Sequence, residues 1–407
     1  MADEDRFAKG DLNSVMAAYP HVADWVRDFE SRYGTRPIYY GPLDRDAKKE
    51  RPLNLIYLAK EPIFIHIYEP PEDDDGSGGE ILWFGLEPQL TEEEENMRRE
   101  LVETLLQEAP TAPTFTTDGE FENILTQMVD RYTVLESDVS AAPRRQGRLW
   151  EMIGMDDKRV IVTPEQRARL EYIIIRDLIK NGPLEPLLSD EMLEDIHSIG
   201  LKHIHMDHKV FGMVTSNIRF RERELLSRYL RAMSERIGRP VSDNKPIIDG
   251  ALLDGSRINI IFSDDVSMLG PSFTIRKFAE ETISIIQLIK WGTISSQVAA
   301  YIWICLEYGM SVLVSGETAS GKTTTLNAIL PFIDHNVKIY SAEDTPEVKV
   351  RHKIWQRLVT RDSKNEESRV EMFDLLKAAL RSRPRYIIIG EIPVSYTHLT
   401  LPTKRIV

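Results

Sequence analysis

The clearest candidate for chemistry in this chain is a glycine-rich loop with the pattern Gly316-x-x-x-x-Gly321-Lys322-Thr323. The two glycines allow backbone N–H groups to turn inward and surround phosphate oxygens. The ammonium of Lys322 would reach the β- and γ-phosphates of a nucleotide, and the hydroxyl of Thr323 would bind Mg²⁺. A glycine turn without function is the alternative interpretation. The predicted nucleotide-binding residues are Gly316, Glu317, Thr318, Ala319, Ser320, Gly321, Lys322, Thr323 and Thr324.

The segments around the loop predict the fold that such chemistry needs. Residues 312–314 are apolar and predict a strand that leads into the loop, and residues 323–330 predict a helix that leads out of it. Further apolar runs alternate with helical segments up to residue 390, which predicts a largely parallel sheet. Because ligands bind at the carboxyl ends of parallel strands, residues that follow these strands should converge on the loop.

Two glutamates occupy such positions. Glu391 follows the apolar run 386–390 and is predicted to hold Mg²⁺ together with Thr323. Glu343, next to Asp344, follows the predicted strand 337–340 and is suited to polarise an attacking water. For Glu343 alone, a helix cap or a surface acid is the alternative. No Asn-Lys-x-Asp signature follows the loop, so the sequence favours ATP over GTP.

Composition limits the class of protein. The 407 residues suggest two to three domains, and a hydrophobic content of 42% is enough for globular cores. A formal net charge of −14 argues against nucleic acid as the main partner, since phosphate backbones attract basic surfaces. The single cysteine, Cys305, cannot form an internal disulfide, which fits a reducing cytosol. The charged N-terminus predicts no signal peptide, and no apolar run has the length of a membrane span.

The chain is predicted to contain five segments. Residues 1–110 form a small α/β extension that would dock a partner, and residues 111–154 a connector rich in Pro, Thr and charge. Residues 155–283 form a mixed α/β domain, and residues 284–392 the nucleotide-binding domain. Residues 393–407 form the fifth segment, a C-terminal tail.

Local signals predict several elements in the first 240 residues. Residues 63–68 and 81–84 predict strands on either side of an acidic glycine-rich loop. Helices should begin at two capping boxes, Thr91 with Glu94 and Thr163 with Gln166. The basic residues between 219 and 239 alternate with glutamates and predict a solvated helix face.

Three histidines at positions 203, 205 and 208 raise the question of a metal site. Alternation along a strand places Ile204 and Met206 on one face and His203 and His205 on the other. No cysteine and no clear fourth ligand are nearby, so a solvated hairpin face is favoured over a metal centre.

Seven motifs follow one another along the chain, at residues 184–190, 194–196, 253–257, 270–278, 316–325, 343–344 and 380–392. In this order they resemble the motifs of the secretion "traffic" ATPases of type II secretion, type IV secretion and type IV pili. The resemblance covers about residues 165–392. The extension before residue 110 is similar to that of the archaeal branch, which drives assembly of pili or archaella.

The resemblance implies a RecA-like P-loop ATPase core that uses ATP and Mg²⁺. It implies a homo-hexameric ring, cytoplasmic and peripheral to the inner face of the cell membrane, that works on a polytopic membrane platform protein and not on nucleic acid. Glu343 matches the family's catalytic glutamate and Glu391 its Walker B glutamate. Arg257 and Arg276 match arginines that close onto the nucleotide's phosphates, whereas without the resemblance surface salt bridges would be the simpler reading.

The chain departs from the family after Ile392. The family continues with a histidine box, and His398 does not lie in a matching motif. Back-translation of the tail resembles a sequencing-library adaptor, so we interpret residues 393–407 as non-native and the ATPase core as incomplete. The sheet should then have an unpaired edge, with uncovered apolar surface and a tendency to aggregate.

Several functions stay open at this point. The first is a motor for secretion or for archaeal filament assembly, and the second a conjugative or tight-adherence ATPase with the same chemistry. The chain as written could also bind nucleotide without turnover. A helicase or DNA translocase is disfavoured by the charge.

Overall fold

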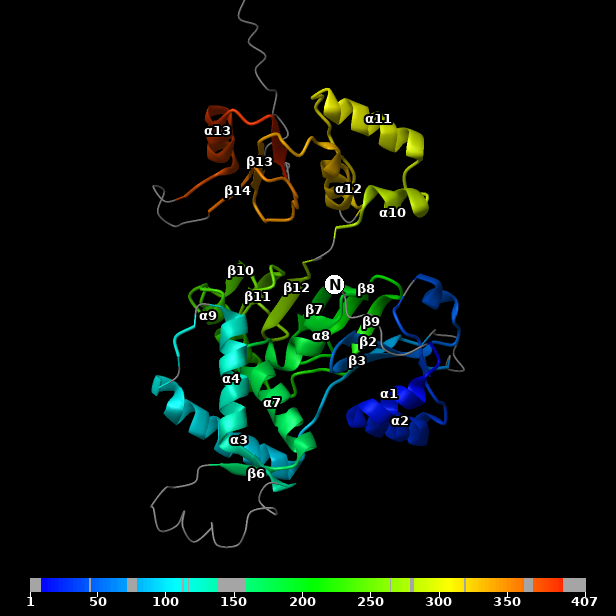
Figure 1. The fold of residues 1–407 in the computed structure, drawn as a ribbon, viewed down its shortest axis with the longest axis vertical. Helices are drawn as coiled ribbons and strands as arrows, with labels where there is room; N and C mark the ends of the chain where they lie inside the picture. The colour runs from blue at the N-terminus through cyan, green and yellow to red at the C-terminus, as the bar shows by residue number, and fades with distance from the viewer. Residues whose placement is uncertain are drawn as a thin grey trace, which may run out of the picture. The chain divides into compact units, whose positions relative to one another are not determined.

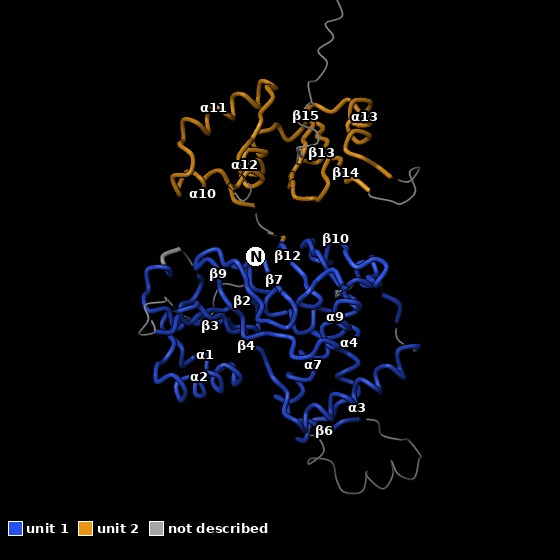
Figure 2. Tube along the Cα trace, turned by 180° about the vertical axis from the view of Figure 1, so that it is seen from behind, with its two compact units in different colours: residues 1–277 blue, residues 278–407 orange. Residues whose placement is uncertain are grey.

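The computed structural model divides the chain into two compact units, Met1–Lys277 and Phe278–Val407 (Figure 2). We describe each unit by itself. The residues that the structure describes are 9–43, 45–71, 79–111, 113–115, 117–137, 159–263, 265–278, 282–317, 320–361 and 369–390.

Unit 1 is built on a ten-stranded, largely antiparallel sheet with the order β1-β2-β3-β4-β9-β8-β7-β12-β11-β10 (Figure 1). Within this order, the six strands β9-β8-β7-β12-β11-β10 pair with one another in antiparallel register. The strands are β1 (Ile38–Tyr39), β2 (Asn54–Lys60), β3 (Ile63–Tyr68), β4 (Leu82–Leu86), β7 (Leu193–Ile199), β8 (His205–His208), β9 (Gly212–Ser216), β10 (Ile247–Ala251), β11 (Arg257–Ile261) and β12 (Ser272–Arg276).

The predicted segments 1–110 and 155–283 contribute to the same sheet. They meet where β4 pairs in parallel with β9, with Leu82 opposite Thr215 and Trp83 opposite Ser216. Strands β3 and β4 confirm the two strands predicted at 63–68 and 81–84.

The helices of unit 1 begin where the sequence predicts. Both capping boxes are present, at Thr91 with Glu94 and at Thr163 with Gln166. A small two-stranded parallel sheet joins β5 (Thr133–Leu135) and β6 (Val160–Val162) beside these helices. The helices are α1 (Leu12–Ala18), α2 (Pro20–Tyr33), α3 (Glu92–Glu108), α4 (Asp118–Tyr132), α7 (Pro164–Leu178), α8 (Glu185–Ser189), α9 (Arg223–Arg236) and the short 3-10 turns η1 (Arg45–Lys49), η2 (Ala109–Thr111) and η3 (Gly182–Leu184).

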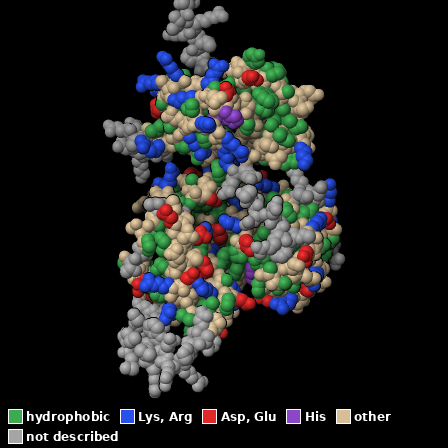
Figure 3. Space-filling model, viewed as in Figure 1, with side chains coloured by type: hydrophobic (Ala, Val, Ile, Leu, Met, Phe, Trp, Pro, Cys, Tyr) green, Lys and Arg blue, Asp and Glu red, His purple; other side chains and the backbone are tan. Residues whose placement is uncertain are grey.

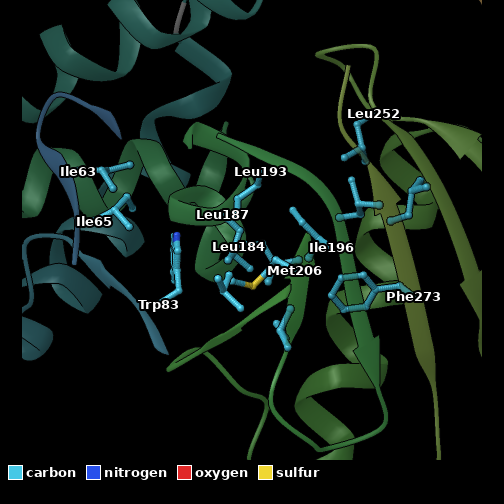
Figure 4. Packing of buried hydrophobic residues seen from close by; sticks show 14 of the residues in the cluster. Ile63, Ile65, Trp83, Leu184, Leu187, Leu193, Ile196, Met206, Leu252 and Phe273 are labelled. Carbon is cyan, nitrogen blue, oxygen red and sulfur yellow. The ribbon is translucent and has the colours of Figure 1, made fainter. Parts of the chain in front are cut away.

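A continuous apolar core lies along this sheet. Trp83 from β4, Leu187 from α8 and Met206 from β8 belong to one buried cluster (Figure 4). On the part of the sheet formed by β2, β3 and β4, the helices α1 and α2 cover a second cluster (Figure 1). The buried core therefore continues from segment 1–110 into segment 155–283.

Asp190, just after α8, joins these two segments through polar contacts. Its Oδ2 accepts hydrogen bonds from the hydroxyl of Tyr57 at 2.8 Å and from Nε1 of Trp83 at 2.9 Å, and its Oδ1 accepts from the backbone N–H of Met192 at 3.0 Å. Asp190 is completely buried. A buried carboxylate needs such donors, because leaving it unpaired would cost several kcal/mol.

Unit 2 contains a parallel sheet with the order β14-β13-β15, and this confirms the predicted sheet type. Leu326 of α12 and the turn after it pack against β13 and β15. The elements are α10 (Ile285–Lys290), α11 (Ser296–Glu307), α12 (Lys322–Ile329), η4 (Leu330–Phe332), β13 (Ile339–Glu343), β14 (Trp355–Val359), α13 (Met372–Ser382) and β15 (Tyr386–Ile389).

The strand predicted at residues 312–314 is wrong for this structure. The segment is irregular, and Leu313 is 79% exposed. Apolar, β-prone residues form a strand only when a neighbouring strand completes their hydrogen bonds, and among the described residues none lies beside this segment.

Apolar side chains are also exposed on α11. Figure 3 shows hydrophobic side chains gathered where α11 lies in the same view of Figure 1. Tyr301, Trp303 and Ile304 of this helix are more than half exposed. In the described part of the chain, no helix is both long enough and apolar enough to cross a membrane.

Candidate nucleotide-binding site

The predicted phosphate loop opens directly into α12. Gly321 has φ 84°, a left-handed conformation that glycine adopts without strain, and α12 begins at the next residue, Lys322. A Cβ at Gly316 would lie 2.6 Å from the hydroxyl oxygen of Ser320, so a side chain there would fill the space that the loop encloses. The backbone conformation therefore requires glycine at position 321, and a side chain at position 316 would displace the Ser320 hydroxyl.

The polar groups of the loop lie at the N-terminus of α12. The ammonium of Lys322 donates to the carbonyl oxygen of Glu317 at 2.6 Å, across the mouth of the loop. Thr323 and Thr324 occupy the first turn of the helix and are half-buried. This arrangement of N–H groups, ammonium and hydroxyl fits a phosphate with its magnesium ion. Thr318 and Ala319 lie outside the described residues.

Glu343 ends β13 and is completely buried. Its Oε1 accepts hydrogen bonds from the backbone N–H groups of Glu347 at 2.8 Å and Val348 at 2.6 Å. Its Oε2 accepts from Nε of Arg357, on β14, at 3.3 Å. Burial raises the pKa of Glu343, while the two N–H groups and the Arg357 charge oppose that rise. The carboxyl is thus neither a helix cap nor a surface acid.

The ends of β13 and β15 are adjacent, as the sequence predicts. The N–H of Gly390 donates to the carbonyl oxygen of Ala342 at 3.0 Å. A Cβ on Gly390 would lie 3.0 Å from Cγ of Glu343, so the glutamate side chain lies against this backbone. Glu391 itself lies outside the described residues, and its predicted role stays a prediction.

Asn327 connects the loop helix to Glu343, and the sequence reasoning did not find it. This residue of α12 donates from Nδ2 to the carbonyl oxygen of Glu347 at 3.0 Å and accepts at Oδ1 from the N–H of Lys349 at 2.9 Å. The segment it holds is the one whose N–H groups bind Glu343. A polar amide in an otherwise apolar turn, Leu326 to Ala328, was the only signal available in the sequence.

The two predicted arginines lie in unit 1. Arg257 on β11 is directly opposite Arg276 on β12. Nε of Arg276 is 3.9 Å from Oδ1 of Asp195 on β7, and both side chains are partly exposed. The structure brings these arginines together with each other, and their contact with nucleotide remains a prediction because the loop belongs to unit 2.

The three histidines at 203, 205 and 208 do not converge. Ile204 and Met206 are completely buried, as the alternation predicts. His208 is buried as well, with Nε2 3.2 Å from the hydroxyl of Tyr57, so only His203 and His205 lie on the open side. In the described residues the one group with metal-ligand spacing is Asp195, His197 and Asp207, all half-buried. Nε2 of His197 lies 3.6 Å from Oδ2 of Asp207, and Asp195 lies 3.9 Å from Nε of Arg276.

Comparisons with known proteins support the motif assignment. Residues 177–396 match the family model described as "Type II/IV secretion system protein". An uncharacterized protein of Methanocaldococcus jannaschii is 48% identical over 386 residues, which is 95% of this chain and 68% of that protein. A second uncharacterized protein of the same organism is 35% identical over 58% of this chain but only 33% of its own length.

Other relatives carry functional names. The conjugal transfer protein TrbB of Rhizobium radiobacter is 34% identical over 37% of this chain and 45% of its own length. Among solved structures, the ATPase DotB of Legionella pneumophila is 16% identical, with a TM-score of 0.36 over 53% of this chain and 59% of that one. The pilus retraction motor PilT is 17% identical, with a TM-score of 0.35 over 55% of this chain and 60% of that one.

The family assignment depends on the sequence matches. One match covers more than half of the chain, and one relative at 48% identity is covered for more than two thirds of its length. The helices and sheets of the structure confirm the predicted fold class, a mixed α/β protein. The chain therefore belongs to the family of type II/IV secretion system proteins, the traffic ATPases that its motifs resemble.

Proposed function

We propose that this chain is part of an ATP-hydrolysing motor that drives filament assembly or protein secretion in a type II or type IV secretion system, or in an archaeal pilus or archaellum. The observation that carries the proposal is the connection between loop and glutamate. The phosphate loop opens α12, and Asn327 of that helix holds the segment whose N–H groups orient Glu343.

In this proposal the loop binds the phosphates and Glu343 orients the water. The N–H groups after Gly316 and Gly321 surround the β- and γ-phosphates, and Lys322 exchanges the carbonyl of Glu317 for phosphate oxygens. Thr323 and Glu391 would hold Mg²⁺, which neutralises charge on the transferring phosphoryl group. Glu343, ionised and fixed by its donors, accepts a hydrogen bond from the attacking water.

Arg257 and Arg276 supply the remaining positive charge. They would close from unit 1 onto the phosphates as arginine fingers do, so that hydrolysis is coupled to motion of one unit relative to the other. In a homo-hexamer at the inner face of the membrane, this motion would act on a polytopic platform protein. In this proposal, partner docking is the role of segment 1–110. The arginines come from segment 155–283, and the nucleotide binds to segment 284–392.

Two substitutions test the proposal. Lys322→Ala should abolish ATP binding, because the loop loses its only ammonium, and Glu343→Gln should preserve binding and stop turnover. Binding is measured by calorimetry and turnover by phosphate release. Tight binding by the lysine variant would exclude the loop assignment, and normal turnover by the glutamine variant would remove Glu343 from the mechanism.

A conjugative or tight-adherence ATPase is the second candidate. It is favoured by the relatives named as conjugal transfer proteins, at 28 to 34% identity over 37 to 54% of this chain. Its chemistry would be the same and its cargo different. Stoichiometric ATP binding by the unmodified chain without any turnover would instead favour a nucleotide-binding module.

A further inference from the structure

The hydrogen bonds of Glu343 leave one of its oxygens open. A carboxylate offers about four acceptor positions, two on each oxygen. Two N–H groups, from Glu347 and Val348, occupy Oε1. Among the described residues, Oε2 accepts from one donor, Nε of Arg357 at 3.3 Å. The described contacts therefore leave an unused acceptor position on Oε2, the oxygen that Arg357 contacts.

Arg357 is itself held in place. Its guanidinium lies 5.3 Å from the ring centroid of Trp355, on the same strand, in a cation–π contact. Nε1 of Trp355 donates to the hydroxyl of Ser341 at 2.9 Å. Ser341 on β13 is the register partner of Arg357 on β14, so the parallel pairing brings the arginine beside the glutamate two residues further on. The position of Arg357 thus depends on the sheet and not on a flexible loop.

Arg357 is also the charged group in contact with Glu343 among the described residues. The loop 344–348 presents backbone N–H groups, β15 presents the backbone of Gly390, and α12 acts through the neutral amide of Asn327. The glutamate side chain is 0% exposed, and the arginine is 34% exposed. Burial raises the pKa of Glu343, and Arg357 lowers it.

We propose that Arg357 is a positioning residue for Glu343: it orients Oε2 so that this oxygen can accept a hydrogen bond from the attacking water. The inference rests on the proposed function, in which Glu343 orients that water. Arg357 lies outside all seven motifs that carry the family resemblance, and nothing in its spacing points to the glutamate.

The test compares three variants of the full chain for ATP turnover across a pH series. Arg357→Gln removes the charge and retains a polar side chain, and Arg357→Lys retains the charge. Arg369→Gln is the matched control, because Arg369 also pairs with a carboxylate, that of Glu371 at 3.4 Å, but on the exposed surface.

The glutamine variant should have a lower kcat at neutral pH. The acid limb of its profile of kcat against pH should move to higher pH by on the order of one pH unit. KM for ATP should change little, because Arg357 is not expected to touch the nucleotide. The lysine variant should restore most of the acid limb, and the control should behave like the parent. A lower kcat with an unmoved acid limb would indicate a structural role and overturn the proposal, as would unchanged kinetics.

Two further measurements distinguish a failure of the proposed role of Glu343 from a failure of the proposed role of Arg357. If Glu343→Gln turns over normally, the proposed function of Glu343 has failed, whatever Arg357 does. If the parent shows no turnover, a double-mutant cycle of Arg357→Gln and Glu343→Gln on the unfolding midpoint in urea measures the contact directly. Non-additive losses support the pairing, and additive losses exclude it.

Discussion

Arg257 and Arg276 lie directly opposite each other on the antiparallel strands β11 and β12. Opposite residues in such a pair project from the same face of the sheet, and two like charges there destabilise it. Asp195 approaches only Arg276, at 3.9 Å. An anion bound between the two guanidinium groups would relieve the repulsion, and this is compatible with the proposed contact of the pair with phosphate.

Removing either arginine should slow turnover and leave nucleotide binding to the loop largely intact. We expect Arg257→Gln or Arg276→Gln to lower kcat by on the order of 10³-fold, the effect typical of an arginine that stabilises charge on the transferring phosphoryl group. Phosphate-release assays at saturating ATP measure this. Arg228→Gln, on the exposed face of α9, is the matched control and should have normal kcat. A normal kcat in the Arg257 and Arg276 variants, or an equal fall of kcat in the control, would contradict the assignment.

Asn327 should matter for turnover although it is not expected to touch the nucleotide. Replacing it with Leu leaves the carbonyl of Glu347 and the N–H of Lys349 without their partner, at a cost of about 1–3 kcal/mol. The N–H groups that fix Glu343 would then lose their support, so kcat should fall while the affinity for ATP persists. Asn336→Ala, in an exposed turn, is the control. Equal kcat in both variants would show that the connection has no catalytic role.

Asp190→Ala should destabilise unit 1 by about 3 kcal/mol, because the hydroxyl of Tyr57 and the indole N–H of Trp83 remain buried without an acceptor. Urea unfolding followed by circular dichroism measures the change. Glu191→Ala, at the exposed neighbouring position, should change stability by less than about 0.5 kcal/mol. Similar losses in the two variants would mean that the buried contacts contribute little.

The stability of unit 1 should depend on pH through His208. Burial lowers the pKa of His208 to about 4, from an ordinary value near 6.5. Below pH 6.5 the unfolded chain therefore binds a proton that the folded chain refuses, and stability falls until about pH 4. The full contribution is about 3 kcal/mol.

The check is the slope of unfolding free energy against pH in His208→Gln. This variant should lose the part of the slope between about pH 4 and 6.5 that His208 provides. His203→Gln, from the exposed side of the same hairpin, should retain it. If both variants keep the parent slope, His208 is not the group that titrates.

Local interactions made much of this chain predictable. The two capping boxes involve residues three positions apart, so Thr91 with Glu94 and Thr163 with Gln166 could be read without tertiary information. The alternation of buried and exposed residues identified Ile204 and Met206 as core. The left-handed turn at Gly321, just before α12, was predictable for the same reason, since it is a local backbone requirement.

Contacts between distant segments were not predictable in this way. The strand expected at 312–314 failed because strand formation depends on a neighbour and not on composition alone. Arg357 and Asn327 contact the Glu343 region only because β13, β14 and α12 pack together, and their spacing along the chain carries no signal.

The sequence by itself determined the helix starts and the family, because each depends on short-range geometry or on motifs in a fixed order. Only the tertiary structure decided that segments 1–110 and 155–283 share one sheet, that Arg257 faces Arg276, and that Arg357 contacts Glu343. The physical reason is that sheet register and side-chain burial are set by the packing of remote segments, which no local pattern encodes.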